Sequence, residues 1–334
     1  MKETLSTIAT RTGLSITTVS RVLSGNADRY RISKDTQAKV IREARLCNYH
    51  SGAPARKGRT GMVGLLLPSV SNPYFAEMAQ TLIYTLRQSG YTSIVMDTME
   101  DEDMFNDSMC SLAARRVDGM IVVPCGADCT IPEKIEAEGT PVVLIDRFYQ
   151  GTRLPYVTTD NYQGGLEATR FLISRGHRDI ACIQGIDISL PNQERVAGYR
   201  DAMAEAGIAP LINVVGNDFS TQNGYIETSL LLCRSHRPSA IFALSNTIAI
   251  GAIKAIRETG LRIPGDISLI TFDNNIYLDY LEPAITRISQ PVPDMARLAV
   301  KILLERVNCA SSSYSHLRLS PTMIQGASVA FIKQ

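Results

Sequence analysis

Residues 5–23 read Leu5-Ser-Thr-Ile-Ala-Thr-Arg-Thr-Gly13-Leu-Ser-Ile-Thr-Thr-Val-Ser-Arg21-Val-Leu23. Apolar side chains recur at spacings of three and four on both sides of Gly13, which is typical of two short helices that each bury one face. Ser15 stands just before the second pattern, where its hydroxyl can accept hydrogen bonds from the free amides of a first helical turn. The stretch therefore predicts two helices joined by a tight turn, a helix-turn-helix.

The polar side of the second predicted helix carries side chains that suit a DNA-reading helix. We expect Thr17 and Arg21 to contact base edges and Ile16 to touch a thymine methyl group. The hydroxyl side chains around them are expected to hold phosphates, because hydroxyls hydrogen-bond well to phosphate oxygens. A loop at 26–33 and a basic linker add further candidates. The expected DNA-contacting residues are Ser15, Ile16, Thr17, Thr18, Ser20, Arg21, Asn26 and Arg56.

Charge is distributed unevenly along the chain. Residues 1–60 hold twelve Lys or Arg and four Asp or Glu, a formal charge of +8, whereas the remainder holds 22 and 29, a formal charge of −7. The total of +1 thus conceals a basic head on an acidic body. Positive charge that coincides with a helix-turn-helix pattern predicts binding to the phosphate backbone of a nucleic acid.

Length and composition indicate a soluble globular protein of two or three domains, with 334 residues of which 45% are hydrophobic and 20% charged. The sequence contains neither a membrane-length apolar stretch nor a signal segment, so a cytoplasmic location is expected. The seven cysteines are scattered, which favours reduced thiols over a disulfide framework. Cys125 and Cys129 have no nearby Cys or His to complete a metal site, and we expect neither a metal nor another cofactor.

Beyond the first two helices, the sequence predicts a third helix, a linker and a long α/β body. The third helix is expected at about 35–46 with Val40, Ile41 and Ala44 inward, which makes residues 1–49 a small all-α DNA-binding head. Residues 50–61, rich in glycine and basic side chains, are expected to form a hinge linker. From residue 62 onward, short buried-strand patterns alternate with helical patterns, as in parallel sheets with helices on both faces. Strands are expected at 62–68, 93–96, 119–123, 142–145, 180–183, 214–215, 240–244 and 267–272, and helices at 73–89, 103–115, 164–174, 195–206, 224–233, 249–259 and 294–307.

The predicted fold class is therefore a small all-α helix-turn-helix head plus an α/β body of two doubly wound parallel-sheet subdomains. In open parallel sheets, ligands bind outside the carboxyl ends of the strands. A ligand site is accordingly expected where the two halves of the body face each other.

Ordered matches over most of the chain resemble the lac-repressor (LacI/GalR) family of bacterial transcription regulators. They include Val19-Ser-Arg-Val-Leu23, Ser71-Asn-Pro-Tyr-Phe-Ala-Glu77, Arg175-Gly-His177, Arg195-Val-Ala-Gly-Tyr199 and Ser289-Gln-Pro291. The resemblance implies a periplasmic-binding-protein-like domain over 62–334 that binds an effector and dimerises. It implies an N-lobe of about 62–156 and 291–321, a C-lobe of about 157–290 and 322–334, and crossings between them near Val157, Gln290 and Pro321.

The ligand-binding positions of the family carry over one at a time. Tyr74 and Phe75 imply an apolar wall after the first strand of the body, although Phe75 also suits plain helix core. Arg195 implies a forked donor for two hydroxyls or a carboxylate. Asp160 would face the cleft from a crossing, and Asp273 would end a buried strand at the ligand edge. The implied ligand-binding residues are Tyr74, Phe75, Asp160, Ser189, Arg195, Phe219 and Asp273.

Three departures from the family pattern matter. The loop at 26–33 is longer than the usual form and adds two arginines and a tyrosine near the DNA. Ser245-Asn246 stands where the family usually has Asn-Asp, which removes a carboxylate from the site. Gly58 stands where the family carries a leucine that wedges into the minor groove, so we expect a less bent operator. The remaining carboxylates, the arginine and the aromatic walls suit a sugar or sugar derivative, with a purine or a sugar acid as alternatives.

These observations predict a sequence-specific DNA-binding transcription regulator, a repressor, whose operator affinity is controlled by a small sugar-like molecule. Because one short helix reads few bases, we expect a homodimer on double-stranded palindromic DNA and no membrane partner. The alternative is a cytoplasmic sugar-binding protein of the periplasmic-binding-protein fold without operator function. No nucleophile elbow, P-loop or histidine metal cluster occurs in the sequence, so no enzymatic activity and no catalytic residues are expected.

Overall fold

The computed structural model describes residues 4–23, 27, 29–46, 59–308 and 315–332. They belong to two compact units, Met1–Gly61 and Met62–Gln334, which we call the head and the body. Asn26, Arg56 and Gly58 lie outside the described residues. Within the described ranges, no helix combines the length and apolar character needed to span a bilayer.

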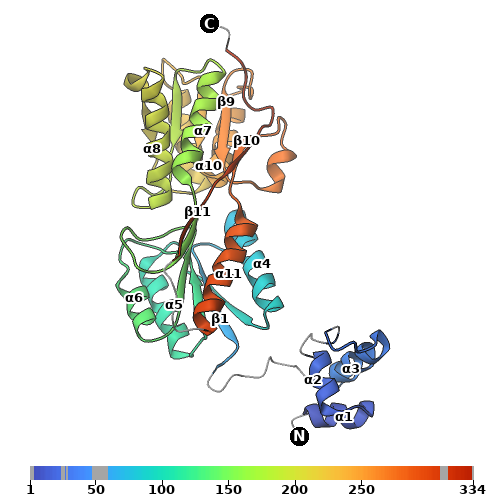
Figure 1. The fold of residues 1–334 in the computed structure, drawn as a ribbon. Helices are drawn as coiled ribbons and strands as arrows, with labels where there is room; N and C mark the ends of the chain where they lie inside the picture. The colour runs from blue at the N-terminus through green and yellow to red at the C-terminus, as the bar shows by residue number, and fades with distance from the viewer. Residues whose placement is uncertain (1–3, 24–26, 28, 47–58, 309–314, 333–334) are drawn as a thin grey trace. The chain divides into compact units, whose positions relative to one another are not determined.

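The described residues of the head form three helices around one small core: α1 (Leu5–Thr12), α2 (Ile16–Leu23) and α3 (Lys34–Leu46) (Figure 1). Gly13 ends α1 in the left-handed conformation, and the Ser15 hydroxyl caps α2 by accepting a hydrogen bond from the Thr18 amide at 3.0 Å. The expectation that Ile41 points inward is wrong, since its side chain is 41% exposed. Val40 and Ala44, four residues apart, define the buried face of α3 instead.

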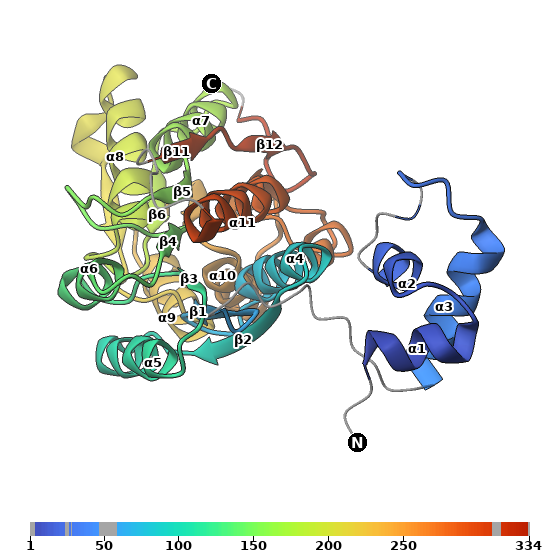
Figure 2. The same cartoon turned by 60° about the horizontal axis from the view of Figure 1, so that its bottom comes forward.

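The N-lobe of the body is built on a parallel sheet with strand order β11-β5-β4-β3-β1-β2. Helices α4 and α11 cover one face and α5 and α6 cover the other (Figure 2). Because both faces are covered, β3 and β4 are buried at every position, as their continuous apolar runs predict. The strands are β1 (Met62–Leu67), β2 (Thr92–Asp97), β3 (Gly119–Val122), β4 (Val142–Ile145), β5 (Tyr156–Thr159) and β11 (His316–Leu319), and the helices are α4 (Pro73–Gln88), α5 (Glu102–Ala114), α6 (Thr130–Ala137) and α11 (Val292–Asn308).

The C-lobe repeats this architecture with strand order β12-β10-β9-β8-β6-β7. All pairings are parallel except that of β12 with β10. Helices α7 and α8 pack into one apolar cluster of the sheet, and α9 and α10 pack into the other. The strands are β6 (Ile180–Ile183), β7 (Asn213–Val215), β8 (Ala240–Ala243), β9 (Ser268–Phe272), β10 (Thr286–Ser289) and β12 (Thr322–Ile324), the helices are α7 (Asn161–Ser174), α8 (Leu190–Glu205), α9 (Thr221–Leu232) and α10 (Asn246–Glu258), and two 3₁₀ turns are η1 (Ala209–Leu211) and η2 (Ile276–Asp279).

The chain passes between the two sheets three times: from β5 to α7, from β10 to α11 and from β11 to β12. The first crossing comes later than the expected position near Val157, since β5 runs to Thr159 in the sheet of the N-lobe. The two threonines of β5 are buried although polar, which hides this strand from an apolar pattern. Helix α6 was likewise absent from the predicted elements.

Glycines bring paired helices of the C-lobe into backbone contact. A methyl group on Gly165 of α7 would lie 2.3 Å from the carbonyl oxygen of Arg195 on α8. Gly198 of α8 has the same relation to Tyr162 of α7, also at 2.3 Å. These close approaches fix how far α8, with Arg195 in its second turn, stands from α7.

Replacing Gly165 by alanine should therefore force α7 and α8 apart. We expect Gly165→Ala to lower the free energy of unfolding by about 1–3 kcal/mol, because overpacking outweighs the better helix propensity of alanine. Urea unfolding measures the loss. Gly265→Ala is the matched control, since its new methyl group would meet nothing closer than 3.5 Å. Equal stability of the two variants would show that the helices separate at no cost.

Candidate functional site

The outer surface of α2 carries most of the expected DNA-contacting side chains. Ile16, Thr17 and Arg21 are exposed, and Ile16 exposes 51% of its surface although it is apolar. Thr18 and Ser20 are half-buried. The hydroxyls of Ser15 and Thr18 lie 2.8 Å apart, so the cap of α2 and the candidate phosphate contacts share the same atoms. This surface has the exposure that base and phosphate contacts require.

Arg21 is held by an aromatic side chain from the loop that follows α2. The guanidinium carbon of Arg21 lies 3.9 Å from the ring centroid of Tyr30, and that of Arg29 lies 5.9 Å away. An arginine over an aromatic face is attracted by the ring quadrupole and loses part of its rotational freedom. Tyr30 therefore orients Arg21, a role that sequence reasoning did not assign to it.

A pocket lies between the two lobes of the body, enclosing about 370 Å³ of space that includes solvent at its mouth. We call it the interlobe pocket. It lies at the carboxyl ends of strands from both sheets, the place where open parallel sheets bind ligands. Of the seven ligand positions implied by the sequence, six line it: Tyr74, Phe75, Ser189, Arg195, Phe219 and Asp273.

Asp160 is not among the residues that line the interlobe pocket, which corrects the expectation that it faces the cleft. Its carboxylate accepts a hydrogen bond from the Gln163 amide at 3.0 Å and so caps α7. Because β5 extends to Thr159, Asp160 is the first residue of the crossing and its side chain turns back to the helix that follows.

Ser245, named from the sequence as a changed position of the site, also lines the pocket. Sequence reasoning missed six further lining residues: Asn72, Glu100, Asp146, Arg147, Pro191 and Gln290. One of them had a clear signal. Asp146 directly follows the buried strand β4, just as Asp273 directly follows β9, and these strands hold equivalent places in the two sheets. The same rule that selected Asp273 thus applies to Asp146.

Each aspartate accepts hydrogen bonds, and the two groups of bonds meet where Tyr74 lies beside Gln290. The Tyr74 hydroxyl donates to Asp146 Oδ1 at 2.5 Å, and its oxygen also lies 3.2 Å from Gln290 Oε1. Gln290 Nε2 donates to Asp273 Oδ1 at 2.7 Å, and the backbone amide of Asn246 donates to Asp273 Oδ2 at 3.2 Å. Because Gln290 lies in a crossing, this network ties the N-lobe to the C-lobe through the pocket.

Both aspartates have strained backbone. Asp146 has φ 66° and Asp273 has φ 74°, in the left-handed region that residues other than glycine rarely adopt. Met99 and Glu100 share this feature, and Glu100 also lines the pocket. Strain of this kind persists only where the surroundings impose it, and it gathers at functional sites.

Burial changes the protonation of the network. Burial raises the pKa of Asp146 above its usual value, although the nearby Arg147 opposes the shift. Burial, and then the charge of Asp146, raise the pKa of Tyr74 well above its usual value, so this hydroxyl keeps its proton and acts as a donor. Burial also raises the pKa of the nearby Glu77. Keeping these carboxylates in the pocket therefore costs the folded protein free energy of desolvation.

Arg195 is fixed on the C-lobe side of the interlobe pocket. Its side chain donates to Asn161 Oδ1 at 2.8 Å and to the Leu244 carbonyl oxygen at 2.7 Å, and its guanidinium carbon lies 3.8 Å from the centroid of Phe272. Only 4% of Arg195 is exposed. A buried guanidinium that is already positioned can donate to a ligand at little further entropic cost.

Aromatic rings and two further C-lobe groups complete the lining. Phe75 comes from the N-lobe and Phe219 from the C-lobe, and Gly185 leaves the space that the ring of Phe219 fills. The Ser189 hydroxyl is buried without a hydrogen-bond partner among the described residues. Ser245 caps α10 with its hydroxyl, as the Ile248 amide donates to it at 3.2 Å. Such a pocket presents rings to an apolar face and donors and acceptors to hydroxyl groups.

Comparison with known proteins gives matches to both units of the chain. The model of bacterial regulatory proteins of the lacI family matches residues 4–51, and that of the periplasmic binding protein-like domain matches residues 169–329. The ribose operon repressor of Haemophilus influenzae is 33% identical over 337 residues, covering 99% of each chain. The transcriptional repressor PurR of Edwardsiella ictaluri is 33% identical over 333 residues, covering 98% of this chain and 97% of its own.

A solved structure supports the same fold. A LacI family transcriptional regulator from Enterococcus faecium with bound ribose superimposes with a TM-score of 0.76 at 26% identity. It covers 81% of this chain and 100% of its own. Most of this chain therefore has a structural counterpart in a regulator whose structure holds ribose.

The Arg21–Tyr30 contact predicts how α2 meets DNA. Arg21→Ala should reduce discrimination between operator and altered sequences by about 1–3 kcal/mol at one base pair, because a base contact is lost there. Tyr30→Leu should lose part of the same discrimination, since Arg21 is then less well oriented. Arg42→Ala, on α3, is the control for loss of one positive charge. Equal weakening on all sequences by Arg21→Ala would show a phosphate contact instead.

Proposed function

The chain belongs to the lacI family of bacterial regulatory proteins and is a DNA-binding transcription regulator, and we propose that it is a repressor controlled by a small effector in the interlobe pocket. The operator is expected to be a palindromic duplex read by α2 of two subunits. The residues proposed to contact DNA are those on the outer surface of α2, together with Asn26 and Arg56 outside the described residues.

The observation that carries the proposal is the pair of strained, buried aspartates that face the pocket from equivalent strand ends of the two lobes. A carboxylate out of water is costly unless its lone pairs are used. Asp146 and Asp273 use theirs partly on Tyr74, Gln290 and the Asn246 amide. A ligand with several hydroxyl groups could bond to both aspartates at once and so bind both lobes.

The proposed effector is a sugar or a sugar derivative. Phe75 and Phe219 offer faces for the apolar side of a sugar ring, while Arg195 and the aspartates offer donors and acceptors for its hydroxyls. The regulator from Enterococcus faecium holds ribose, which supports this class. A purine is the second candidate, but three carboxylates, those of Glu100, Asp146 and Asp273, line the interlobe pocket and suit the hydroxyl groups of a sugar better than a planar base.

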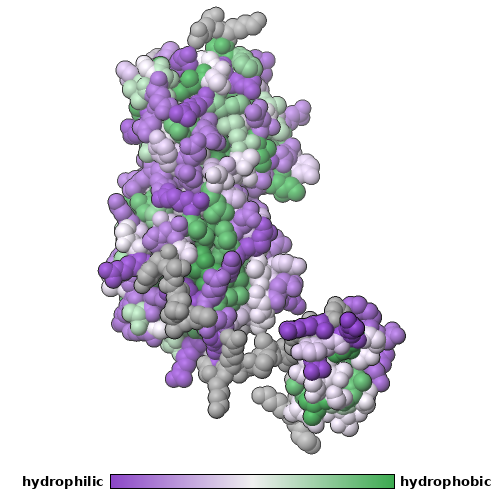
Figure 3. All heavy atoms as spheres, in the orientation of Figure 1, coloured by the Kyte–Doolittle hydropathy of each residue, from purple (hydrophilic) through white to green (hydrophobic). Residues whose placement is uncertain are grey.

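Effector binding would reach the DNA only through different affinities for two arrangements of the lobes. The hydrogen bond of Gln290 to Asp273 and the contact between Tyr74 and Gln290 are the interactions that a ligand would replace. We propose a homodimer as the working unit, since a single recognition helix reads too few bases for tight specific binding. Exposed Ile83 and Tyr84 on α4 are candidates for its interface, and Figure 3 shows apolar side chains on the N-lobe face where α4 and α11 lie.

We further propose that the pocket binds its ligand without transforming it and that the protein acts in the cytoplasm, where its operator lies. The similar proteins are transcription regulators, and none of the three histidines that the structure describes lines the pocket. A binding protein without operator function would show no salt-sensitive affinity for a duplex, whereas a regulator loses affinity steeply as salt rises.

The proposal is tested by operator release. Fluorescence anisotropy with a duplex selected from a random pool should show that at least one pentose or hexose changes the operator affinity of the native protein. Arg195→Ala and Asp273→Asn should abolish this response while ligand-free operator binding stays near native. Arg170→Ala, an exposed arginine of α7, is the control and should keep the response. A response that survives in both pocket variants would place the effector elsewhere.

A further inference from the structure

One ion pair lies inside the interlobe pocket. Both nitrogens at the tip of Arg147 bond to the two carboxylate oxygens of Glu100, at 2.6 and 2.8 Å. Both residues line the pocket, and the side chain of Arg147 is only 11% exposed. This bidentate geometry matches a planar fork to a carboxylate and is the strongest form of the pair.

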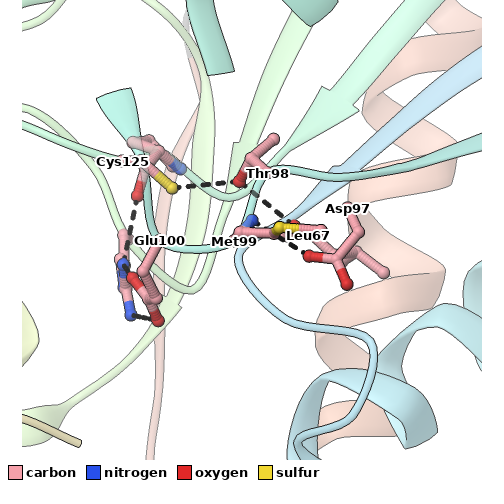
Figure 4. A network of polar contacts seen from close by, with 8 residues as sticks. Leu67, Asp97, Thr98, Met99, Glu100 and Cys125 are labelled. Carbon is pink, nitrogen blue, oxygen red and sulfur yellow. Dashed lines mark hydrogen bonds and ion pairs between the residues drawn. The ribbon is translucent and has the colours of Figure 1, made fainter. Parts of the chain in front are cut away.

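The backbone that presents Glu100 is strained and tightly held. Met99 and Glu100 have φ 50° and 57°, two consecutive left-handed residues that are not glycine. The Glu100 amide donates to the Pro68 carbonyl oxygen at 2.8 Å, and the Met99 amide donates to Asp97 Oδ1 at 3.0 Å. The Thr98 hydroxyl contacts Cys125 Sγ at 3.2 Å and donates to the Leu67 carbonyl oxygen (Figure 4). Left-handed backbone is costly for residues other than glycine, so the surrounding hydrogen bonds hold Met99 and Glu100 in this conformation.

Arg147 stands where the two aromatic walls meet. Its guanidinium carbon lies 5.8 Å from the ring centroid of Phe75 and 5.8 Å from that of Phe219. Any ligand lying between these rings therefore comes close to Arg147. A guanidinium with its fork open at this point would attract a carboxylate or a phosphate.

Glu100 occupies that fork. We propose that Glu100 sets the charge selectivity of the pocket. By neutralising Arg147, it makes this end of the pocket bind uncharged hydroxyl groups and exclude anionic ligands. The inference rests on the proposed function of the interlobe pocket as an effector site and specifies its ligand class. It excludes phosphorylated sugars and sugar acids that direct their charge to Arg147.

Anionic ligands are excluded because each would have to take the place of the Glu100 carboxylate. An anionic ligand could reach Arg147 only by displacing Glu100, and the displaced carboxylate would then lie beside the ligand charge. Like charges at short range repel, and this repulsion is a specificity device directed against the wrong ligand. A hydroxyl group can instead bond to the outer lone pairs of Glu100 without breaking the pair.

Inorganic phosphate is a probe that does not depend on the identity of the effector. Thermal unfolding of the full chain is followed in increasing sodium phosphate, against sodium chloride at equal ionic strength. Glu100→Gln should bind phosphate about tenfold or more tightly than the native protein, because the fork of Arg147 becomes free. The double variant Glu100→Gln/Arg147→Gln should lose this gain in phosphate affinity. If Glu100→Gln does not fold, Glu100→Ala serves in its place and should show the same gain.

Glu205→Gln is the matched control for loss of a bidentate pair. Glu205 bonds to two nitrogens of Arg170 on the surface between α8 and α7, away from the pocket. It should gain no phosphate binding. Equal phosphate affinity in native protein and Glu100→Gln would overturn the proposal, as would a gain that persists without Arg147.

A second arm uses sugars matched in ring and size: D-glucose with D-glucuronate, and D-galactose with D-galacturonate. Calorimetry should show that the native protein prefers the neutral member of a pair that it binds, and that Glu100→Gln reduces or reverses this preference. An unchanged preference contradicts the role of Glu100. Absence of binding by any neutral sugar counts against the proposed effector class, while the phosphate arm still decides the role of Glu100.

Discussion

Two carboxylates buried at the ends of parallel strands are the constraint on which the rest of the body depends. Asp146 and Asp273 stand away from bulk water and need hydrogen-bond donors in its place. Tyr74 supplies one from the N-lobe, and Gln290 supplies another from a crossing between the lobes. The Tyr74 bond lies within the N-lobe, whereas Gln290 holds Asp273 from a crossing and also lies 3.2 Å from the Tyr74 hydroxyl, so the two groups meet between the lobes. A ligand that replaces these bonds changes the contact between the lobes directly.

The surrounding structure makes this arrangement precise. Gly165 brings α7 against the backbone of Arg195, so the guanidinium is placed by backbone packing and not by a flexible stem alone. The strained loop of Met99 and Glu100 does the same for the ion pair on the opposite side. Rigid placement costs stability in the empty protein but lowers the entropy that a ligand must lose on binding.

Much of the fold could be predicted from the sequence, because apolar runs and helical spacing report burial on both faces of a sheet. The strands at 119–122 and 142–145 are clear examples. The pattern failed where burial is polar, as in β5 with its two threonines, and where one inward residue stands beside another, as with Ile41 beside Val40. Crossings between lobes came from the family resemblance, since periodicity carries no information on which sheet a strand joins.

Asp273 was predictable because it directly follows a buried strand, whereas Arg195, in the second turn of α8, came from the family resemblance. The roles of Glu100 and Gln290 were not predictable. Glu100 bonds to Arg147, 47 residues away in sequence, and Gln290 bonds to Asp273, 17 residues away. Asp160 shows the reverse error, because the sequence places it at a crossing but cannot tell whether its side chain caps α7 or enters the pocket. Side-chain direction at a crossing depends on tertiary packing.

The central claim is that the empty protein keeps a costly carboxylate in the pocket, and stability against pH measures it directly. Burial raises the pKa of Asp146 above the ordinary 3.8, so the folded protein binds this proton more tightly than the unfolded chain. The stability contributed by this group is complete below the unfolded pKa and is lost as pH rises through the folded pKa. The amide of an asparagine at position 146 does not titrate, so the Asp146→Asn variant does not lose this stability as pH rises.

Thermal unfolding of native protein and Asp146→Asn should therefore be compared from pH 4 to pH 7 without ligand. The account predicts that the melting temperature of Asp146→Asn, relative to native protein, rises as pH increases across this range. A difference that stays constant would show that ionisation of Asp146 carries no net cost in the empty protein, and one that falls with increasing pH would show that the charged Asp146 stabilises it. Either result would contradict a costly carboxylate in the pocket.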